Sequence, residues 1–323
     1  MISLVIYICL FIGLIKFGQI IFGIIGIIQK FILRKPRNHY QCYGISQDTK
    51  NISWAVVTGG SDGIGLAFCH HLAKSGFNIC IIGRTQSKIQ EKLVEIKQTN
   101  PSIQTDYVIA DFFKYDKIED YQLIVKKLHG KDIGMFIINA GWAEPGRFDK
   151  AENKDFQNML NINALHVIYL TQAILPTLLS RSKRSAILVT SSVAGQILTP
   201  GNLPYNIAKR FASIFTMGLS YEVKDKIDML SFEPIGVSTN LMKEKPNLLV
   251  NTAEYASYCA LRDLGNGDIN TIGSFIHNQQ YFFAKNILGG WSKPLFYKLF
   301  TEIHPRMTKK FEEQRLKESK LKN

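Results

Sequence analysis

The sequence predicts an α/β protein in which a doubly wound parallel sheet is preceded by an N-terminal membrane anchor. Three observations carry this prediction. Short apolar runs alternate with longer amphipathic stretches after residue 53, a glycine-rich turn follows the first of these runs, and residues 1–33 are almost wholly apolar. Alternating strands and helices are typical of a parallel sheet covered by helices, whose ligands bind beyond the carboxyl ends of the strands.

The apolar N-terminal segment is long enough to enter a membrane. Between Ile2 and Gln29 the only charged side chain is Lys16, and about 20 apolar residues suffice to cross a bilayer. A central lysine costs about 2.5 to 3.5 kcal/mol, but each aliphatic residue returns about 0.3 to 0.6 kcal/mol, so the segment should insert. A single span and a re-entrant hairpin that turns near residues 16–19 both fit this pattern.

The charges after the anchor predict its orientation and limit the partners. A basic cluster follows the apolar run and consists of Lys30, Arg34, Lys35 and Arg37. Because cytoplasmic flanks are enriched in lysine and arginine, the rest of the chain is expected in the cytosol. The net charge of +13 favours lipid headgroups or a phosphate-bearing ligand, and no nucleic-acid partner is expected. Five scattered cysteines indicate a reducing compartment and no metal site.

The periodicity beyond residue 53 predicts the strands and the long helices in order. The strands are expected at residues 54–58, 78–82, 104–109, 132–138, 185–190 and 227–232. The helices are expected near residues 63–75, 86–98, 155–180 and 204–223.

The turn after the first strand has the composition of a phosphate-binding loop. Glycines without side chains allow the backbone to approach a pyrophosphate, and the N-terminus of the following helix faces it. The candidate cofactor contacts in this turn are Gly59, Ser61, Asp62, Gly63, Ile64 and Gly65. An acidic residue after the second strand would bind an unphosphorylated ribose, but Arg84 stands there and suits a 2′-phosphate. The sequence therefore predicts NADPH rather than NADH.

Three ordered motifs, Thr58-Gly-x-x-x-Gly63-Ile-Gly65, Asn139-Ala140-Gly141 and Tyr205-Asn-Ile-Ala-Lys209, resemble the short-chain dehydrogenase/reductase family over about residues 53–240. This resemblance implies a single Rossmann-like domain. It also implies that Asp111 contacts the adenine, that Asn139 lines the cofactor, and that Val237 and Thr239 belong to the loop over the nicotinamide. The chain departs from the family at Ile138 and at Ile235, where many members have asparagine and glycine.

The same resemblance implies four catalytic residues. Tyr205 is the expected proton donor, and Lys209, one helical turn later, is expected to lower the pKa of this tyrosine and to hold the nicotinamide ribose. Ser192 matches the serine that binds the carbonyl group, with Ser191 as its alternative. Asn163 matches the helix asparagine that holds a proton-relay water, with Asn161 as its alternative.

Within the family, the chain most resembles the branch of very-long-chain 3-oxoacyl-CoA reductases and 17-beta-hydroxysteroid dehydrogenases. The expected reaction is reduction of a 3-oxoacyl-CoA to the 3-hydroxyacyl-CoA at the endoplasmic reticulum membrane. The alternatives are a hydroxysteroid or retinoid alcohol dehydrogenase and a non-catalytic cofactor-binding scaffold. The expected partners are an acyl-CoA or other lipid carbonyl substrate and membrane lipids, with other elongation enzymes or a second copy of the chain as further candidates.

The sequence divides into four segments. Residues 1–33 form the anchor, 34–52 a basic and polar connector, 53–290 the dinucleotide-binding catalytic domain, and 291–323 an amphipathic, basic C-terminal tail. The tail is expected to lie on a membrane or to cover the domain, because its apolar residues recur at helical spacing before a lysine-rich end.

Overall fold

The computed structural model describes residues 2–44, 52–146, 148–150, 152–197 and 201–288. The chain forms two compact units, residues 1–37 and residues 38–323. The tail expected at residues 291–323 lies outside the described residues.

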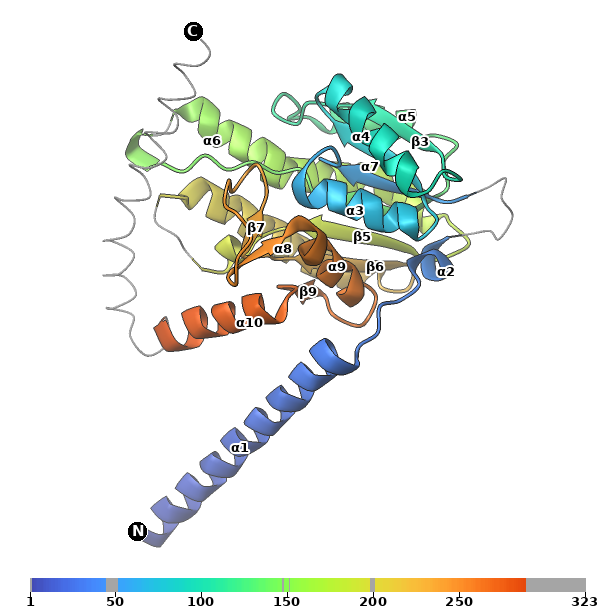
Figure 1. Ribbon diagram of the computed structural model, residues 1–323. Coiled ribbons are helices and arrows are strands. Elements are labelled where there is room, and N and C mark those ends of the chain that lie inside the picture. Colours follow the sequence, from blue (N-terminus) through green and yellow to red (C-terminus); the bar gives the residue numbers. More distant parts are fainter. Residues whose placement is uncertain (1, 45–51, 147, 151, 198–200, 289–323) are drawn as a thin grey trace. The chain divides into compact units, whose positions relative to one another are not determined.

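The first unit is a long apolar helix. Helix α1 (Ile2–Ile28) continues into a π-helical turn, η1 (Gln29–Leu33). The segment Leu10–Leu33 has a mean hydropathy of 2.2 and is long and apolar enough to cross a membrane. The helix runs without a break through residues 16–19, where a re-entrant hairpin would need a turn (Figure 1). This unit is therefore a candidate membrane anchor.

A seven-stranded parallel sheet forms the centre of the second unit, in the order β3-β2-β1-β4-β5-β6-β9. Its strands are β1 (Trp54–Thr58), β2 (Asn78–Gly83), β3 (Thr105–Ile109), β4 (Ile133–Ile138), β5 (Ser185–Thr190), β6 (Ile227–Phe232) and β9 (Asn270–Thr271). The order of the strands reverses between β1 and β4, which is the position where ligands of doubly wound sheets bind. The predicted fold class is confirmed.

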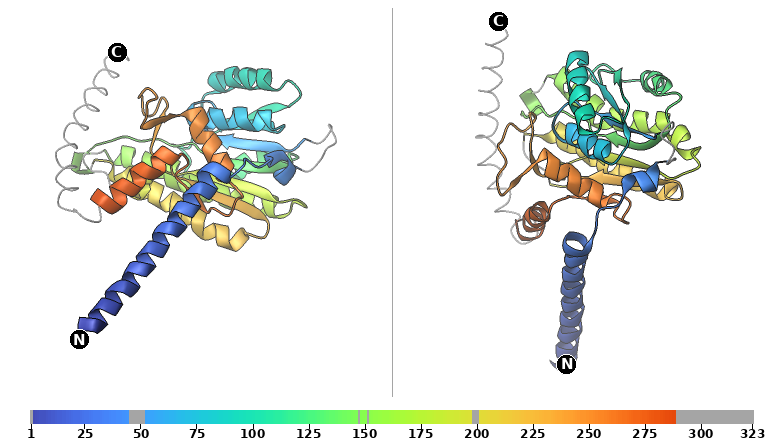
Figure 2. Two further views of the ribbon diagram at one scale, coloured as in Figure 1. Left: turned by 60° about the horizontal axis from the view of Figure 1, so that its bottom comes forward. Right: turned by 45° about the vertical axis from the view of Figure 1, so that its right-hand side comes forward.

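Helices cover both faces of the sheet (Figures 1 and 2). One face packs against α3 (Gly63–Lys74), α4 (Gln86–Thr99) and α9 (Ala253–Asp263). The other face packs against α5 (Ile118–Lys127), α7 (His166–Leu179) and α8 (Leu203–Val223). Along β1, Ala55 and Val57 belong to the first core and Trp54 and Val56 to the second, because successive strand residues point to opposite faces.

The remaining elements lie around this sandwich of helices and sheet. Helix α6 (Asn153–Leu160) leads through a π-helical segment, η3 (Asn161–Leu165), into α7. Strands β7 (Gly236–Ser238) and β8 (Val250–Thr252) form a second small sheet. Helix α10 (Phe275–Phe282) is followed by η5 (Phe283–Leu288), and the short helix α2 (His39–Tyr43) precedes β1.

The predicted elements agree with the structure to within about two residues, with one exception. The helix expected over 155–180 contains the π-helical segment η3, which no local sequence pattern predicted. Helices α2, α5, α9 and α10 and strands β7, β8 and β9 were not expected, because they are short and their apolar residues follow no long periodic pattern.

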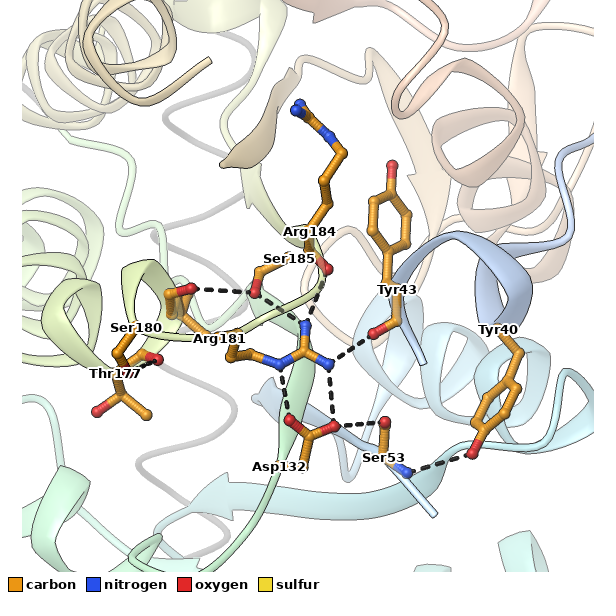
Figure 3. Close-up of polar contacts among 10 residues, drawn as sticks. Tyr40, Tyr43, Ser53, Asp132, Thr177, Ser180, Arg181, Arg184 and Ser185 are labelled. Carbon is orange, nitrogen blue, oxygen red and sulfur yellow. Dashed lines mark hydrogen bonds and ion pairs between the residues drawn. The ribbon is translucent and has the colours of Figure 1, made fainter. Parts of the chain in front are cut away.

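A polar network joins α2 to the amino ends of the strands (Figure 3). Arg181 is 7% exposed, and its guanidinium donates to both carboxylate oxygens of Asp132, which precedes β4, at 2.7 and 2.9 Å. The same guanidinium donates to the carbonyl oxygen of Tyr43 at 2.8 Å and to the hydroxyl of Ser185 at 3.0 Å. Ser53 donates its hydroxyl to Asp132 as well. This network fixes the start of three strands and the end of α2 against one another.

Candidate active site

The turn between β1 and α3 requires its glycines. Gly59 has a φ of +66° and Gly63 a φ of +50°, in the left-handed region that side chains disfavour. A Cβ atom on Gly65 would lie 2.3 Å from the carbonyl oxygen of Gly59, so only glycine allows this close approach. The turn therefore leaves the backbone at the N-terminus of α3 open to a ligand.

Thr58 connects this turn to the end of β4. Its hydroxyl oxygen accepts hydrogen bonds from the backbone N–H groups of Asn139 at 2.9 Å and Ala140 at 3.0 Å. The side-chain oxygen of Asn139 in turn accepts from the hydroxyl of Thr190, at the end of β5, at 3.1 Å. The carboxyl ends of three neighbouring strands are thus held together at the point where the strand order reverses.

Asp62 caps α3 and collects three donors. Its carboxylate accepts from the backbone N–H of Gly63 at 2.7 Å, from Lys88 Nζ at 2.6 Å and from Asn240 Nδ2 at 2.7 Å. Burial acts to raise the pKa of Asp62, but the hydrogen bonds from Lys88 and Asn240 outweigh it and hold the pKa below its ordinary value. The glycine-rich turn is therefore bound to α4 and to the segment after β7.

A cavity of about 650 Å³ opens at this edge of the sheet. Most of the predicted site residues line it, namely Gly59, Ser61, Asp62, Gly63, Ile64, Arg84, Asp111, Asn139, Ser192, Tyr205, Lys209, Val237 and Thr239. Gly65 and Asn163 are not among the lining residues. Gly65 lies beneath the turn against Gly59, and the side chain of Asn163 lies behind Gly141.

Arg84 and Asp111 lie at the end of the cavity formed by β2 and β3. The guanidinium carbon of Arg84 is 5.3 Å from the ring centroid of Phe113, and the side chain is exposed. Asp111 accepts a hydrogen bond from the backbone N–H of Phe113 at 3.3 Å. An exposed cation above an aromatic ring at this position can contact a phosphate and a planar base together.

Tyr205 and Lys209 are one turn apart on α8 and face the cavity together. Pro204 in the first turn fixes the start of the helix. The Nζ of Lys209 is 5.7 Å from the ring centroid of Tyr205 and donates to the carbonyl oxygen of Thr190 at 2.9 Å. Ser192 lines the same wall beside Tyr205 and acts to lower the pKa of the tyrosine hydroxyl. The predicted trio is therefore assembled at one wall of the cavity.

The pKa values of this pair differ from the sequence expectation. Burial raises the pKa of Tyr205 to about 12, although the neighbouring hydroxyl of Ser192 acts in the opposite direction. Burial also lowers the pKa of Lys209 to about 8. We expected Lys209 to depress the pKa of the tyrosine, but its ammonium donates to Thr190 and burial dominates at both groups. Tyr205 is consequently protonated at neutral pH.

The structure distinguishes the two serines at the end of β5. Ser191 is buried, and its hydroxyl donates to the backbone carbonyl of Lys209 at 2.6 Å. Ser192 lines the cavity beside Tyr205; its oxygen accepts from the backbone N–H of Ala194 at 3.1 Å, and its hydroxyl donates to the carbonyl oxygen of Pro234 at 3.4 Å. Ser192 is therefore the serine beside the candidate proton donor, and Ser191 supports the helix backbone.

Both candidate asparagines lie in the π-helical segment η3, but their side chains have different partners. Asn163 donates to the carbonyl oxygen of Trp142 at 2.7 Å and accepts from its N–H at 3.3 Å. A Cβ atom on Gly141 would lie 3.0 Å from Asn163 Oδ1 and 3.2 Å from Lys209 Nζ, so these two atoms flank the same glycine. Asn161 instead donates to the carbonyl oxygen of Phe113 at 3.3 Å. This arrangement favours Asn163, and π-helical turns are frequent at functional sites.

Sequence reasoning missed three residues that shape the site. Thr190 binds both Lys209 and Asn139, while Lys88 and Asn240 bind Asp62. The position of Thr190 at the end of an apolar strand was a usable signal. Asn240 offered none, because its contact with Asp62 spans 178 residues of chain.

The parallel sheet and the polar residues at its carboxyl edge define an α/β oxidoreductase. A family model described as short chain dehydrogenase matches residues 53–248, and the chain belongs to this family. A very-long-chain 3-oxoacyl-CoA reductase from Pyricularia oryzae is 30% identical over 281 residues, which cover 84% of each chain. Another from Mus musculus is 36% identical over 231 residues, which cover 70% of this chain and 72% of that protein.

Solved structures share the fold. A 7beta-hydroxysteroid dehydrogenase superposes with a TM-score of 0.68 at 21% identity over 77% of this chain and 95% of that one. A short-chain dehydrogenase from Sphingobium yanoikuyae, in complex with NADPH, superposes with a TM-score of 0.63 at 19% identity over 76% of this chain and 95% of that one. The predicted family and class of enzyme are confirmed.

Proposed function

We propose that this protein reduces a 3-oxoacyl-CoA to the 3-hydroxyacyl-CoA with NADPH, as a step of long-chain fatty-acid elongation. The observation that carries the proposal is the position of Tyr205, Ser192 and Lys209 at one wall of a cavity whose other end carries the glycine-rich turn and Arg84. The reductases that resemble this chain over most of their length support the acyl-CoA substrate.

The cavity residues fit a nicotinamide dinucleotide phosphate. The open backbone at the N-terminus of α3 would hold the pyrophosphate, and Arg84 would hold the 2′-phosphate. By the family pattern, Asp111 would contact the adenine, Asn139 would line the cofactor, and Lys209 would hold the nicotinamide ribose. Val237 and Thr239 would close over the nicotinamide. The bound cofactor supplies the hydride for the carbonyl carbon.

The residues of the chain supply the proton and the electrostatic stabilisation. The hydroxyl of Ser192 donates a hydrogen bond to the substrate carbonyl, which orients it and stabilises the negative charge that develops on oxygen. Tyr205, protonated at neutral pH because burial raises its pKa, gives its proton to that oxygen. The adjacent ammonium of Lys209 stabilises the tyrosinate that remains. Asn163 holds the backbone of Trp142 beside Gly141, next to the Lys209 ammonium, where protons would be resupplied.

Apolar residues at the cavity suit an acyl chain. Leu241 and Met242 line the cavity and are partly exposed to solvent. A cavity with one polar, catalytic wall and apolar residues at its opening can hold a reactive carbonyl inside and leave a long chain to continue outward. This arrangement is consistent with an acyl substrate longer than the cavity.

The cellular setting follows from the N-terminal unit. We propose that residues 1–33 anchor the protein in the endoplasmic reticulum membrane, that residues 34–52 connect the anchor to the domain, and that the catalytic domain over residues 53–290 faces the cytosol. The apolar helix α1 and the basic residues after it support this proposal. Membrane lipids, other elongation enzymes and a second copy of the chain remain the proposed partners.

The test is a substrate panel with the full-length protein in detergent. NADPH oxidation is followed with 3-oxoacyl-CoAs of increasing chain length, with one ketosteroid and with one retinal. Turnover of long 3-oxoacyl-CoAs alone supports the proposal. Turnover of the steroid or retinal alone would make the protein a hydroxysteroid or retinoid dehydrogenase, and tight NADPH binding without any turnover would make it a scaffold.

Matched variants test the assigned roles within the same assay. Ser192→Ala should lower kcat by about 100-fold, the usual effect of removing one hydrogen-bond donor from a developing oxyanion. Ser191→Ala should affect mainly stability, because its hydroxyl binds the backbone of α8 and not the reacting groups. An equal loss of kcat in both variants would contradict the assignment of Ser192.

A further inference from the structure

The connection between β7 and β8 is an apolar surface beside the cavity. Nine consecutive residues, 241–249, are exposed, and four of them are large and apolar. Figure 1 shows this connection as a loop beside the label of β7. Leu248 is 77% exposed and its neighbour Leu249 is 55% exposed. Adjacent exposed leucines form a surface that water solvates poorly.

The connection is held in place by hydrogen bonds at both ends. Asn240 donates to Asp62, and the hydroxyl of Ser238 donates to the carbonyl oxygen of Glu244 at 2.6 Å. At the other end, the N–H of Asn247 donates to the carbonyl oxygen of Val250 at 3.0 Å. The leucines are therefore presented to solvent by a folded loop.

The loop has an inner and an outer part. Leu241, Met242 and Glu244 line the cavity, whereas Leu248 and Leu249 are not among the lining residues. The outer part also carries the exposed Lys243 and Lys245. The same nine residues thus reach from the candidate catalytic site to an exposed surface of mixed apolar and basic character.

We propose that residues 241–249 dock on a lipid surface that contains anionic headgroups, with Leu248 and Leu249 inserted at the headgroup boundary. Apolar side chains flanked by lysines are typical of interfacial membrane contacts, because the lysines pair with headgroup phosphates while the apolar groups leave water. The acyl chain then passes from the lipid along Leu241 and Met242 into the cavity. This last step rests on the proposed acyl substrate, whereas the docking does not.

A short connection joins the apolar helical segment to the domain that carries this loop. Five residues, 34–38, separate the apolar helical segment that ends at Leu33 from helix α2. A stretch of five residues spans at most about 18 Å. If the apolar helix spans a bilayer, the start of α2 therefore lies within about 18 Å of the end of that helical segment, and the domain that begins there is close enough to contact lipid.

Isolated exposed apolar residues on two helices of the domain serve as control positions for the tests on Leu248 and Leu249. Val94 on α4 is 63% exposed and Leu123 on α5 is 58% exposed. Single exposed apolar side chains are normal on protein surfaces. Both side chains are more than half exposed, as Leu248 is, and neither residue lines the cavity, so they provide controls.

The experiment places one added tryptophan in the full-length chain, reconstituted in phosphatidylcholine and phosphatidylserine vesicles. Leu248→Trp is compared with Val94→Trp, each against the unchanged chain with its three native tryptophans. Lipids brominated near the headgroup should quench the added fluorescence at 248 about twofold more than at 94, if the side chain inserts at the interface. Equal quenching at both positions would overturn the proposal.

A second pair of variants tests the route of the substrate. Leu248→Asp combined with Leu249→Asp should raise the KM for a long 3-oxoacyl-CoA presented in vesicles by about tenfold, because acidic side chains oppose insertion next to anionic lipid. The KM for a short, water-soluble 3-oxoacyl-CoA should not change. Val94→Asp combined with Leu123→Asp should leave both values unchanged. A parallel change for both substrates would overturn the proposed route.

The two proposals fail separately. If no acyl-CoA is reduced by any variant, the proposed function is wrong, and the quenching result still decides whether the loop docks on lipid. If the enzyme reduces acyl-CoAs and Leu248→Trp is not quenched, the docking proposal is wrong.

Discussion

A buried cation lies at each end of the strands of the seven-stranded sheet, and the two cations differ in their hydrogen-bond partners. The amino edge is the side of the sheet where the strands begin, and the carboxyl edge is the side where they end. At the amino edge, Arg181 donates five hydrogen bonds, to Asp132, Tyr43, Arg184 and Ser185. At the carboxyl edge, Lys209 is only 4% exposed, and its ammonium makes one hydrogen bond among the described residues, to Thr190. The arginine is matched by a carboxylate, whereas the lysine lines a cavity.

This difference shows how one sheet separates stability from chemistry. A buried guanidinium whose donors are all engaged stabilises the strands that surround it, provided its carboxylate partner stays in place. A buried ammonium with unused donors costs stability, and burial lowers its pKa to about 8. At the carboxyl edge, the destabilising ammonium of Lys209 lines the cavity, where it can donate hydrogen bonds to a bound ligand.

The largest expected effect is at the carboxyl edge. Tyr205→Phe should lower kcat/KM for carbonyl reduction by about a thousandfold, because it removes the proposed proton donor and leaves the ring in place. Its thermal stability and its affinity for NADPH should stay close to those of the unchanged protein. Tyr221→Phe, on the exposed side of the same helix, is the control. Retained turnover in Tyr205→Phe would refute the assignment.

The next effect is at the amino edge and concerns stability alone. Arg181→Ala leaves the Asp132 carboxylate without its cation and should lower the free energy of unfolding by about 3 kcal/mol. Arg184→Ala removes a more exposed ion pair with Asp228 and should cost about 1 kcal/mol or less. Denaturant titration measures both. If Arg181→Ala changed kcat at a temperature where the variant is folded, the claim that the amino-edge network affects stability alone would be wrong.

A smaller effect is expected for the cofactor. Arg84→Ala should weaken NADPH binding by about 10- to 100-fold, the value of one or two charge-assisted hydrogen bonds to a phosphate. NADH binding should not change, because NADH lacks the 2′-phosphate. Fluorescence titration of both cofactors measures the ratio, with Lys97→Ala on α4 as the control. Equal losses for NADPH and NADH would assign Arg84 to the adenine rather than the phosphate.

Within one pH unit above about pH 8, the smallest effect is the pH dependence that Lys209 imposes. Its pKa is lowered from 10.5 to about 8, so the ammonium that stabilises the tyrosinate is lost above that pH. We expect kcat/KM for reduction to fall by up to tenfold per pH unit above about pH 8. Between about pH 8 and 10.5 the unfolded chain binds more protons at this site than the folded chain, so folding stability should rise there. A flat rate profile up to pH 10 would contradict this reading of the carboxyl edge.

Much of the fold and of the candidate site could be predicted because both rest on local sequence. Apolar runs mark the strands, and residue types after the first two strands mark Gly59 and Arg84 as candidates, while the family resemblance marks Asn139 and Ser192. The spacing of Tyr205 and Lys209 also follows from helical periodicity.

What could not be predicted depends on burial and on distant contacts. The pKa of Tyr205 rises because the folded chain removes its hydroxyl from water, and no sequence pattern measures that. The contact of Asn240 with Asp62 and the π-helical segment η3 are likewise set by tertiary packing. The amino-edge network escaped notice because Arg181 and Asp132 are separated by 49 residues.

The hydrogen bonds of Thr58 carry a consequence for the order of folding. Its hydroxyl binds the backbone of residues 139 and 140, which lie 81 and 82 positions further along the chain. Strands β2 and β3 and their helices lie between, so β1 and β4 pair only after a long loop has closed. Such pairings form slowly, because the entropy of closure is lost before the contacts form. The dinucleotide pocket should therefore form late during refolding. A cofactor that binds this pocket should slow unfolding of the folded domain, but it should not speed the earliest steps of refolding.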